Sequence, residues 1–380
     1  MELTNRQRLT RIFQRKPIDR PALKLWGAAP GMKALHPDYQ PVIDRALQFT
    51  DLFGGAGSPC HLLCGALHRE YVSVQTRPTA DPLWVERVTT VRTPLGDMTG
   101  VYRDSVIGDP GFTTEYLVKD ASDLQKLLSL PYEPEPVSVA GYHQAVADMG
   151  ERGIVTFGLP HAGYGIQDLC GSETLAYFSV DDRELLDEVI ALFASRIQAH
   201  ARAVLATGIR PVFSWVGPEV FVPPLLSPRD FEDFIFRYDK PLCDLIHNGG
   251  GYVWVHSHNK VSRFLDRFIE MGVDVLNPLE PPKNGDIDLA AEVRRYGDRI
   301  GWEGNIEIQE LLLGSPERIE QLIDQCLEAG APSGRMILCP SAGFMEYAHP
   351  TAQYIENLIH YVEYGYKRVN AFRCGRELEG

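Results

Sequence analysis

His256 and His258 stand two positions apart, directly after the short apolar run Tyr252 to Val255. In a β-strand, residues at i and i+2 leave the same face, so both imidazoles are expected to point to one place. Neutral imidazole is a good zinc ligand. Glu219 and Glu280 follow the flanking apolar runs, and their carboxylates could complete a mixed nitrogen and oxygen shell with one position open for water or substrate. The spacing therefore predicts a metal or acid/base site.

A plainer interpretation of these four residues stays open. One histidine could be a hydrogen-bonded supporting residue, and the glutamates could form salt bridges. The convergence of several polar groups at neighbouring strand ends favours at least one chemical role. Cys339 is a further candidate for a ligand or a nucleophile, although a single thiol before Pro340 in an apolar stretch is also typical of a packed core cysteine.

Three residues are candidates for moving protons or orienting substrate. Glu303 and Asn305 follow the apolar pair Gly301-Trp302, and we expect Glu303 to act as a general base or orienting carboxylate rather than as a ligand. Tyr164 is the third candidate. Aromatic side chains near the expected loops could contact a planar substrate, and the candidates for this role are Trp26, Phe221 and Phe344.

These residues need a scaffold that brings successive strand ends together. From about Val137 the sequence repeats an amphipathic helix, a glycine-containing turn and a short apolar strand, which is typical of a parallel sheet. The expected helices are 184–205, 228–247, 261–271, 289–296, 316–328 and 351–364, and the expected strands are 211–216, 252–255, 273–277, 299–302 and 336–338. No linker interrupts these units, so one closed (β/α)8 barrel over residues 1–380 is favoured over two domains.

The first third of the chain is less regular. Residues 4–15 are expected to form a helix capped by Thr4, ahead of a short strand from Ala22 to Trp26. Residues 84–105 alternate around Pro94-Leu95-Gly96-Asp97, which predicts a β-hairpin insertion over one end of the fold.

Composition excludes several function classes. The formal net charge of -14, from 37 Lys and Arg against 51 Asp and Glu, would repel phosphate backbones and anionic lipids, so neither nucleic acid nor a membrane surface is an expected partner. The polar N-terminal segment lacks the apolar stretch of a secretion signal, and no run approaches a membrane-spanning length, so a cytoplasmic location is expected. Seven scattered cysteines indicate buried thiols rather than a disulfide framework.

Short segments in a fixed order resemble the uroporphyrinogen decarboxylase superfamily, which also contains zinc-dependent corrinoid methyltransferases. The matching segments are Lys16-Pro17-Ile18-Asp19-Arg20-Pro21 after the opening helix, Leu226-Ser227-Pro228 with Phe231, His256-Ser257-His258-Asn259, Gly304-Asn305 and the final helix after Pro350. The resemblance covers nearly the whole chain. It implies a distorted (β/α)8 barrel with an N-terminal helical extension.

Two departures separate the branches of that superfamily. Decarboxylases carry an arginine-rich segment after the first strand, where this chain has Trp26-Gly27-Ala28-Ala29-Pro30-Gly31, so a polycarboxylate porphyrinogen would be bound poorly. The thiol-methylating branch carries His-x-Cys and a later cysteine as zinc ligands. In this chain those two positions are His258 and Ala342, and the nearest cysteine, Cys339, lies three residues earlier. A zinc site without these thiolates is a harder Lewis acid, which suits an oxygen ligand.

The resemblance therefore implies an O-demethylating methyltransferase. Zinc would polarise the ether oxygen of a small methoxylated substrate, aromatic substrates included, and the corrinoid of a separate protein would accept the methyl group. Glu303 or Tyr164 would assist proton transfer. Two alternatives stay open, a metal-independent decarboxylase or lyase acting on a smaller acid, and a non-catalytic barrel that binds a partner. A homodimer is compatible with the sequence.

Overall fold

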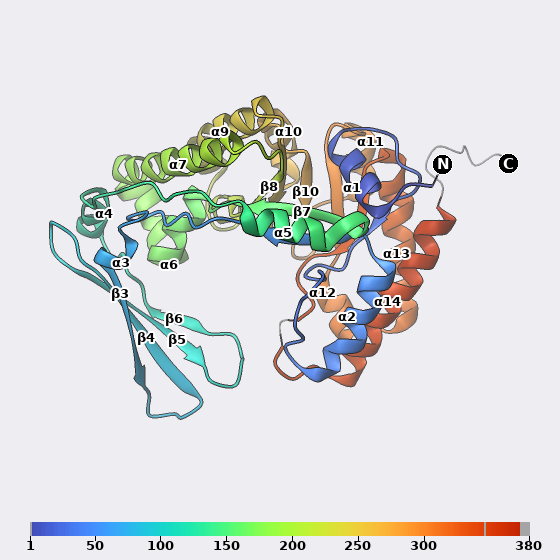
Figure 1. Ribbon diagram of the computed structural model, residues 1–380, viewed down its shortest axis with the longest axis horizontal. Coiled ribbons are helices and arrows are strands. Elements are labelled where there is room, and N and C mark those ends of the chain that lie inside the picture. Colours follow the sequence, from blue (N-terminus) through green and yellow to red (C-terminus); the bar gives the residue numbers. More distant parts are fainter. Residues whose placement is uncertain (1, 346, 373–380) are drawn as a thin grey trace.

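The strands of the barrel follow one another around it in chain order. The computed structural model describes residues 2–345 and 347–372. Eight strands form one parallel sheet in the order β1-β12-β11-β10-β9-β8-β7-β2 (Figure 1). Their bounds are β1 Ala22–Leu23, β2 Leu52–Ala56, β7 Gly153–Gly158, β8 Val212–Val216, β9 Tyr252–His256, β10 Val275–Asn277, β11 Gly301–Ile306 and β12 Met336–Pro340. The expected parallel β/α barrel is confirmed.

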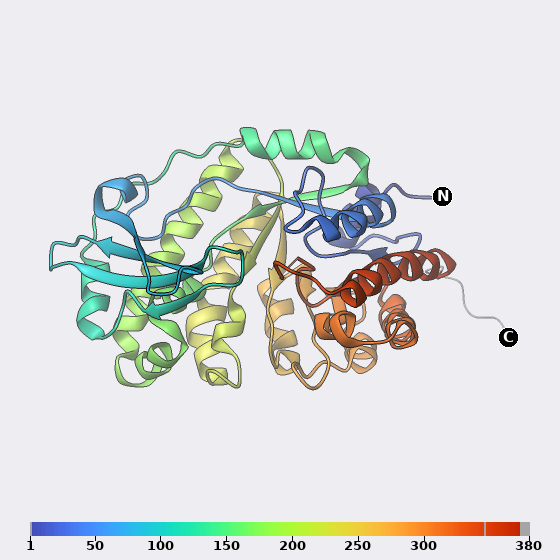
Figure 2. The same ribbon diagram turned by 90° about the horizontal axis from the view of Figure 1, so that it is seen from below.

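Helices lie between and around these strands (Figure 2). The α-helices are α1 Asn5–Phe13, α2 Gln40–Phe49, α3 His68–Tyr71, α4 Ala121–Leu128, α5 Ala140–Met149, α6 Ala162–Asp181, α7 Arg183–Ala206, α8 Pro228–Phe231, α9 Arg237–Asn248, α10 Leu265–Met271, α11 Leu289–Tyr296, α12 Ile308–Leu313, α13 Pro316–Gly330 and α14 Ala352–Ala371. The helix expected at 228–247 is divided by a π-helical segment, Glu232–Phe236, before Arg237–Asn248. Helix α6 was not expected from the sequence.

The hairpin insertion is part of a larger antiparallel sheet. Strands β4 Trp84–Val91 and β5 Met98–Ser105 pair as the predicted hairpin, and β3 Val72–Pro78 and β6 Phe112–Glu115 flank them. This sheet extends away from the barrel below α6 in Figure 1. A methyl group placed on Gly108, in the β5–β6 loop, would lie 3.6 Å from the Ala348 Cβ, so this loop touches the segment that follows β12.

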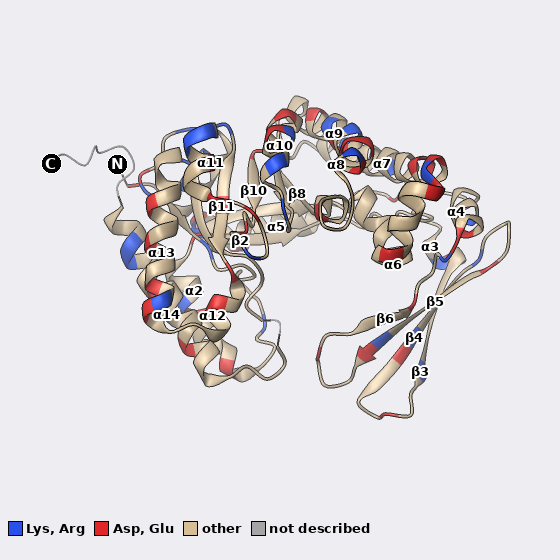
Figure 3. Ribbon diagram, turned by 180° about the vertical axis from the view of Figure 1, so that it is seen from behind, with Lys and Arg blue, Asp and Glu red and all other residues tan. Residues whose placement is uncertain are grey.

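Helix α7 is long and apolar enough to pass a test for a membrane span by length and composition alone. Of its apolar window, 56% is buried inside the protein, as in a core helix. It packs against α6 and α9. In Figure 3 the charged residues of the outer layer lie on helices such as α7, α9, α13 and α14, whereas the barrel strands are mostly uncharged.

A buried charged cluster closes the barrel between β1 and β2. Asp51 accepts a hydrogen bond from the Leu23 backbone N–H at 2.9 Å, and its own N–H donates to the Leu23 carbonyl at 2.6 Å. Its carboxylate also pairs with the Nη1 atoms of Arg8, at 2.6 Å, and Arg20, at 3.2 Å. Arg8 additionally pairs with Asp19. These ion pairs hold the N-terminal segment that contains Arg8, Asp19 and Arg20 against the barrel where β1 lies next to β2.

Asp51→Asn is expected to lower the free energy of unfolding by about 3 kcal/mol, because it leaves buried Arg20 without a charged partner and leaves Arg8 with Asp19 alone. Urea unfolding measures this difference. Asp244→Asn, which removes an i,i+4 pair with Lys240 on the surface of α9, is the control and should cost less than about 0.5 kcal/mol. Equal losses in the two variants would contradict the prediction.

Candidate functional site

The C-terminal ends of the strands form the mouth of the barrel, where both predicted histidines lie. His256 ends β9 and is 5% exposed. Its Nδ1 lies 2.7 Å from Oδ1 of Asn277, which ends β10. His258 Nδ1 lies 2.7 Å from Glu280 Oε1. The two imidazole centroids are 4.4 Å apart. The structure therefore brings His256, His258 and Glu280 together, as the sequence predicts.

A buried ion pair beneath the histidines fixes the protonation pattern of His256. Lys24 Nζ lies 2.6 Å from Glu303 Oε1, and Trp254 Nε1 donates to the other carboxylate oxygen at 2.7 Å. Asn277 Nδ2 donates to Glu303 at 3.0 Å, which determines that the amide oxygen of Asn277 faces His256. An amide oxygen only accepts hydrogen bonds, so Nδ1 of His256 carries the proton and Nε2 carries a lone pair.

The same argument applies to His258. Its Nδ1 faces a carboxylate, which accepts, so in the neutral ring Nε2 is again the atom with the lone pair. No hydrogen bond joins either Nε2 to another residue in the described part of the chain. Metal-binding histidines are commonly oriented in this way, through the ring nitrogen that does not bind the metal. Both rings have the donor chemistry of zinc ligands.

A complete ligand shell is not assembled by these side chains. Among residues 2–345 and 347–372, no three or more His, Cys, Asp or Glu side chains are grouped so that they could share one metal ion. Glu280 orients His258 and also accepts from the Asn259 N–H at 3.0 Å, while Glu219 accepts from the Gly217 N–H at 2.9 Å. The plainer interpretation, in which a glutamate pairs with a histidine, thus describes Glu280. The zinc site stays a prediction.

Three carboxylates surround His258. Burial alone would lower its pKa, but the hydrogen bond and charge of Glu280, together with the charges of Glu219 and Glu307, raise the pKa above its usual value. Burial raises the pKa values of Glu219 and Glu307. These two side chains therefore keep a proton to higher pH than an exposed glutamate does. Glu307 was missed by the sequence analysis, although it directly follows the last residue of β11.

A cavity of about 310 Å³ opens in the barrel beside His256. Lys24, Trp26, Phe53 and Trp254 line it, together with Thr156, Ser214 and several glycines. Lys24 Nζ lies 4.0 Å from the Phe53 ring centroid and 4.9 Å from that of Trp254. Trp26 lies edge-on to His256, with 4.4 Å between centroids. Lys24 was not predicted, although a lysine within the apolar run Ala22 to Trp26 is a recognisable signal.

A sequence model of the family described as "Uroporphyrinogen decarboxylase (URO-D)" matches residues 170–363, which is half of the chain. The chain belongs to the uroporphyrinogen decarboxylase family. Its similarity to curated members is partial. It is 29% identical over 150 residues to uroporphyrinogen decarboxylase of Synechococcus sp. (strain CC9605), and 29% identical over 154 residues to that of Aeromonas salmonicida (strain A449). These matches cover 38% and 40% of this chain and only 38% of the length of each relative.

A solved structure extends the likeness along the chain at the level of fold. A methyltransferase from Methanosarcina mazei superposes with a TM-score of 0.60 at 14% identity, covering 97% of this chain and 99% of that one. At this identity the likeness shows the fold alone. Together with the family match, it confirms that the chain resembles the uroporphyrinogen decarboxylase superfamily, and the methyltransferase branch stays a prediction.

Several predicted site residues of this uroporphyrinogen decarboxylase family member lie away from the cavity. Phe221 and Phe344 are at most 1% exposed and pack in the core, against Phe234 and Tyr39 respectively, rather than lining the cavity as substrate contacts. Cys339 is fully buried, and burial raises the pKa of its thiol, so it is placed as a core cysteine. These positions differ from the predicted roles because an aromatic or thiol side chain in or after a strand can turn either into the barrel or toward the helices, and the roles themselves stay predictions.

The catalytic candidates occupy different environments. Asn305 Nδ2 donates to the Leu279 carbonyl at 3.0 Å, which fastens the loop after β10. Tyr164 lies in the first turn of α6, where burial, followed by the charges of Asp168 and Glu219, raises its pKa. Glu303 is held by the ion pair beneath His256. The geometry thus suits Glu303 and Asn305 to positioning, and their predicted catalytic roles stay predictions.

His256 is expected to make the metal-free protein less stable in acid. Burial, and secondarily the charge of His258, lowers the pKa of His256 to about 3. The unfolded imidazole titrates near pH 6.5, so between about pH 6.5 and 3 the unfolded chain binds a proton that the folded chain does not. This contribution to stability is complete above pH 6.5 and declines below it by up to about 1.4 kcal/mol per pH unit.

Urea unfolding of chelator-treated protein between pH 7.5 and 4.5 checks this dependence. His256→Gln should flatten the decline, whereas His143→Gln, at an exposed position on α5, should leave it unchanged. Identical pH slopes in the parent and in His256→Gln would contradict the assignment.

Proposed function

We propose that the chain is a methyltransferase that removes the methyl group from a small methoxylated compound, aromatic compounds included, and passes it to a separate corrinoid protein. The orientation of the two imidazoles carries the proposal. Nδ1 of His256 is held by Asn277, Nδ1 of His258 is held by Glu280, and both Nε2 atoms are left to bind zinc. Bound zinc would supply a Lewis acid for the ether oxygen.

The cavity beside His256 supports a planar substrate without several acidic groups. Its walls include the rings of Trp26, Phe53 and Trp254, and Lys24, the one cation among the described residues that line it, is already paired with Glu303. A polycarboxylate would need several further cations there. The fold similarity to a methyltransferase over 97% of the chain also supports the proposal.

The residues around the histidines have distinct roles in this proposal. Glu303 and Asn277 hold His256, and Trp26 and Trp254 form the wall against which the substrate lies. The oxygen that loses the methyl group must take up a proton. The raised pKa of Glu219 suits it to supply that proton, and Tyr164 is the alternative donor. The corrinoid protein would approach at the mouth, in the cytoplasm.

Zinc content and demethylation together test this function. We expect about one zinc per chain in the parent after zinc is supplied, and loss of that zinc in His256→Ala and His258→Ala but not in His143→Ala. The zinc-loaded parent should release phenols from methoxybenzoates when Co(I) cobalamin is present. A parent chain that binds no zinc would contradict the zinc-dependent mechanism.

A decarboxylase acting on a smaller acid is the second candidate, and Lys24 favours it. Its ammonium group, although it pairs with Glu303, also lines the cavity and could attract a single substrate carboxylate, and the described residues do not preassemble a three-ligand metal site. Release of carbon dioxide from aromatic monocarboxylates by chelator-treated protein would support this candidate over methyl transfer.

A further inference from the structure

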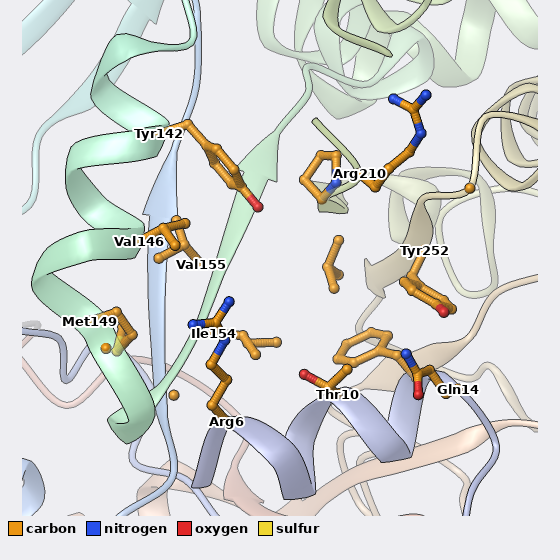
Figure 4. A pocket seen from close by; sticks show the side chains of 16 residues that line it. Arg6, Thr10, Gln14, Tyr142, Val146, Met149, Ile154, Val155, Arg210 and Tyr252 are labelled. Atoms are coloured by element: carbon orange, nitrogen blue, oxygen red, sulfur yellow. The ribbon is translucent and has the colours of Figure 1, made fainter. Parts of the chain in front are cut away.

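A second cavity lies at the opposite end of the barrel from the histidines. It is about 360 Å³ in volume and is bounded by α1, α5 and the amino-terminal ends of β7, β8 and β9 (Figure 4). Its size falls within the range of small-molecule sites. None of its lining residues belongs to the site at the mouth.

One part of this cavity is apolar. Phe13 from α1, Val146 and Met149 from α5, and Ile154 and Val155 from β7 contribute to its lining. The rings of Phe13 and Tyr252 lie 6.2 Å apart between centroids. These apolar side chains can pack against the flat, apolar part of a ligand and shield it from water.

Polar groups without protein partners face the same space. The Tyr142 hydroxyl points into the cavity in Figure 4, and Thr10 and Tyr252 also line it, with the Tyr252 hydroxyl directed away from its middle. All three side chains are partly buried, and among the described residues none of the three hydroxyls takes part in a side-chain hydrogen bond. A gap left only by imperfect packing would be lined by apolar atoms, whereas convergent polar groups on an apolar wall are typical of a ligand site.

Two arginines give the cavity a positive character in an otherwise acidic protein. Arg6 reaches into it from α1 and has one weak ion pair, with Glu151 at 3.6 Å, in which both side chains are about half exposed. Arg210 lies at the far rim, where its Nη1 donates to the carbonyls of Leu205 and Ile209. Arg210 has no ion pair with any described carboxylate. Arginine with free donors is suited to bind a carboxylate.

We propose that this cavity binds a small amphiphilic anion, with a flat apolar body against Val146 and Ile154 and a carboxylate held by Arg6 and the Tyr142 hydroxyl. The site is separate from the reaction at the mouth and does not depend on the proposed function. Because its ligand would bridge α1 to the beginnings of three barrel strands, binding stabilises the folded chain by mass action.

Equilibrium dialysis of the full chain against 1-naphthoate tests the site. We expect saturable binding, a rise in melting temperature at saturation, and binding of neutral 1-naphthamide that is about tenfold weaker, because the charge-assisted hydrogen bonds are lost. Arg6→Gln should weaken naphthoate binding by about tenfold. Val146→Trp, which fills the cavity, should abolish it.

Arg11→Gln is the matched control on the same helix. Its guanidinium donates to the Pro17 carbonyl and it does not line the cavity, so naphthoate binding should change by less than about twofold. Trp26→Ala, at the mouth, should also leave this binding intact. The proposal would be overturned if naphthoate binding were lost in Trp26→Ala but unchanged in both Arg6→Gln and Val146→Trp. It would also be overturned if the parent chain showed no saturable binding.

Discussion

Glu303→Ala is expected to lower the free energy of unfolding by about 3–5 kcal/mol. Glu303 is fully buried and accepts hydrogen bonds from Lys24, Trp254 and Asn277. Removal of its carboxylate leaves the buried ammonium group of Lys24 without a charged partner and two further donors unsatisfied. Urea unfolding at pH 7 measures the loss.

A double variant separates the burial of charge from other effects. Lys24→Met combined with Glu303→Leu removes both charges, so it should recover most of the stability that Glu303→Ala loses. Glu363→Ala breaks the exposed pair with Arg45 and should cost less than about 1 kcal/mol. If Glu303→Ala cost no more than Glu363→Ala, the ion pair would not be formed in solution.

His256→Ala is expected to reduce kcat/KM for demethylation by about 10²–10⁴-fold, because it removes a proposed zinc ligand. Asn277→Leu should reduce it by about 10–100-fold, since the imidazole stays but its Nδ1 loses the group that orients it. Zinc content distinguishes these roles. It should be lost in His256→Ala and weakened, with recovery at higher zinc concentration, in Asn277→Leu.

The exposed His143 on α5 provides the control for this pair of variants. His143→Ala should retain kcat/KM within about twofold, because the side chain lies on the outer layer of the barrel. If kcat/KM of His256→Ala were within about threefold of the parent value, His256 would have no role in the reaction, whatever the metal content.

The barrel itself could be predicted because its signals are local. Strands such as Tyr252–His256 are short apolar runs after a glycine turn, and each is followed by a polar segment and then a helix. The spacing of His256 and His258 was sufficient to predict that both rings meet at the mouth. The antiparallel sheet was predicted only in part, since β3 and β6 carry exposed polar residues that give a weak alternating pattern.

The side-chain network could not be predicted because its partners are distant in sequence. Lys24 and Glu303 are 279 positions apart, and no local pattern relates them. Glu280 was expected as a ligand, but its contact with His258 depends on the path of the loop after β10. The burial of Phe221 and Phe344 could not be predicted for a similar reason. The direction of each ring depends on packing against other elements, such as Tyr39 for Phe344, and not on the neighbouring sequence.

The pairing of β1 with β12 has a consequence for synthesis of the chain on the ribosome. Ala22 and Leu23 pair with Ile337 and Leu338, and the Lys24 carbonyl accepts a hydrogen bond from Tyr361. At typical translation rates these partners emerge roughly 15–60 seconds after the first strand. Until Ile337 and Leu338 emerge the first strand has no neighbour on that side, and until Glu303 emerges the Lys24 ammonium group lacks its counterion. The nascent chain therefore presents an unfinished sheet edge to chaperones for most of its synthesis.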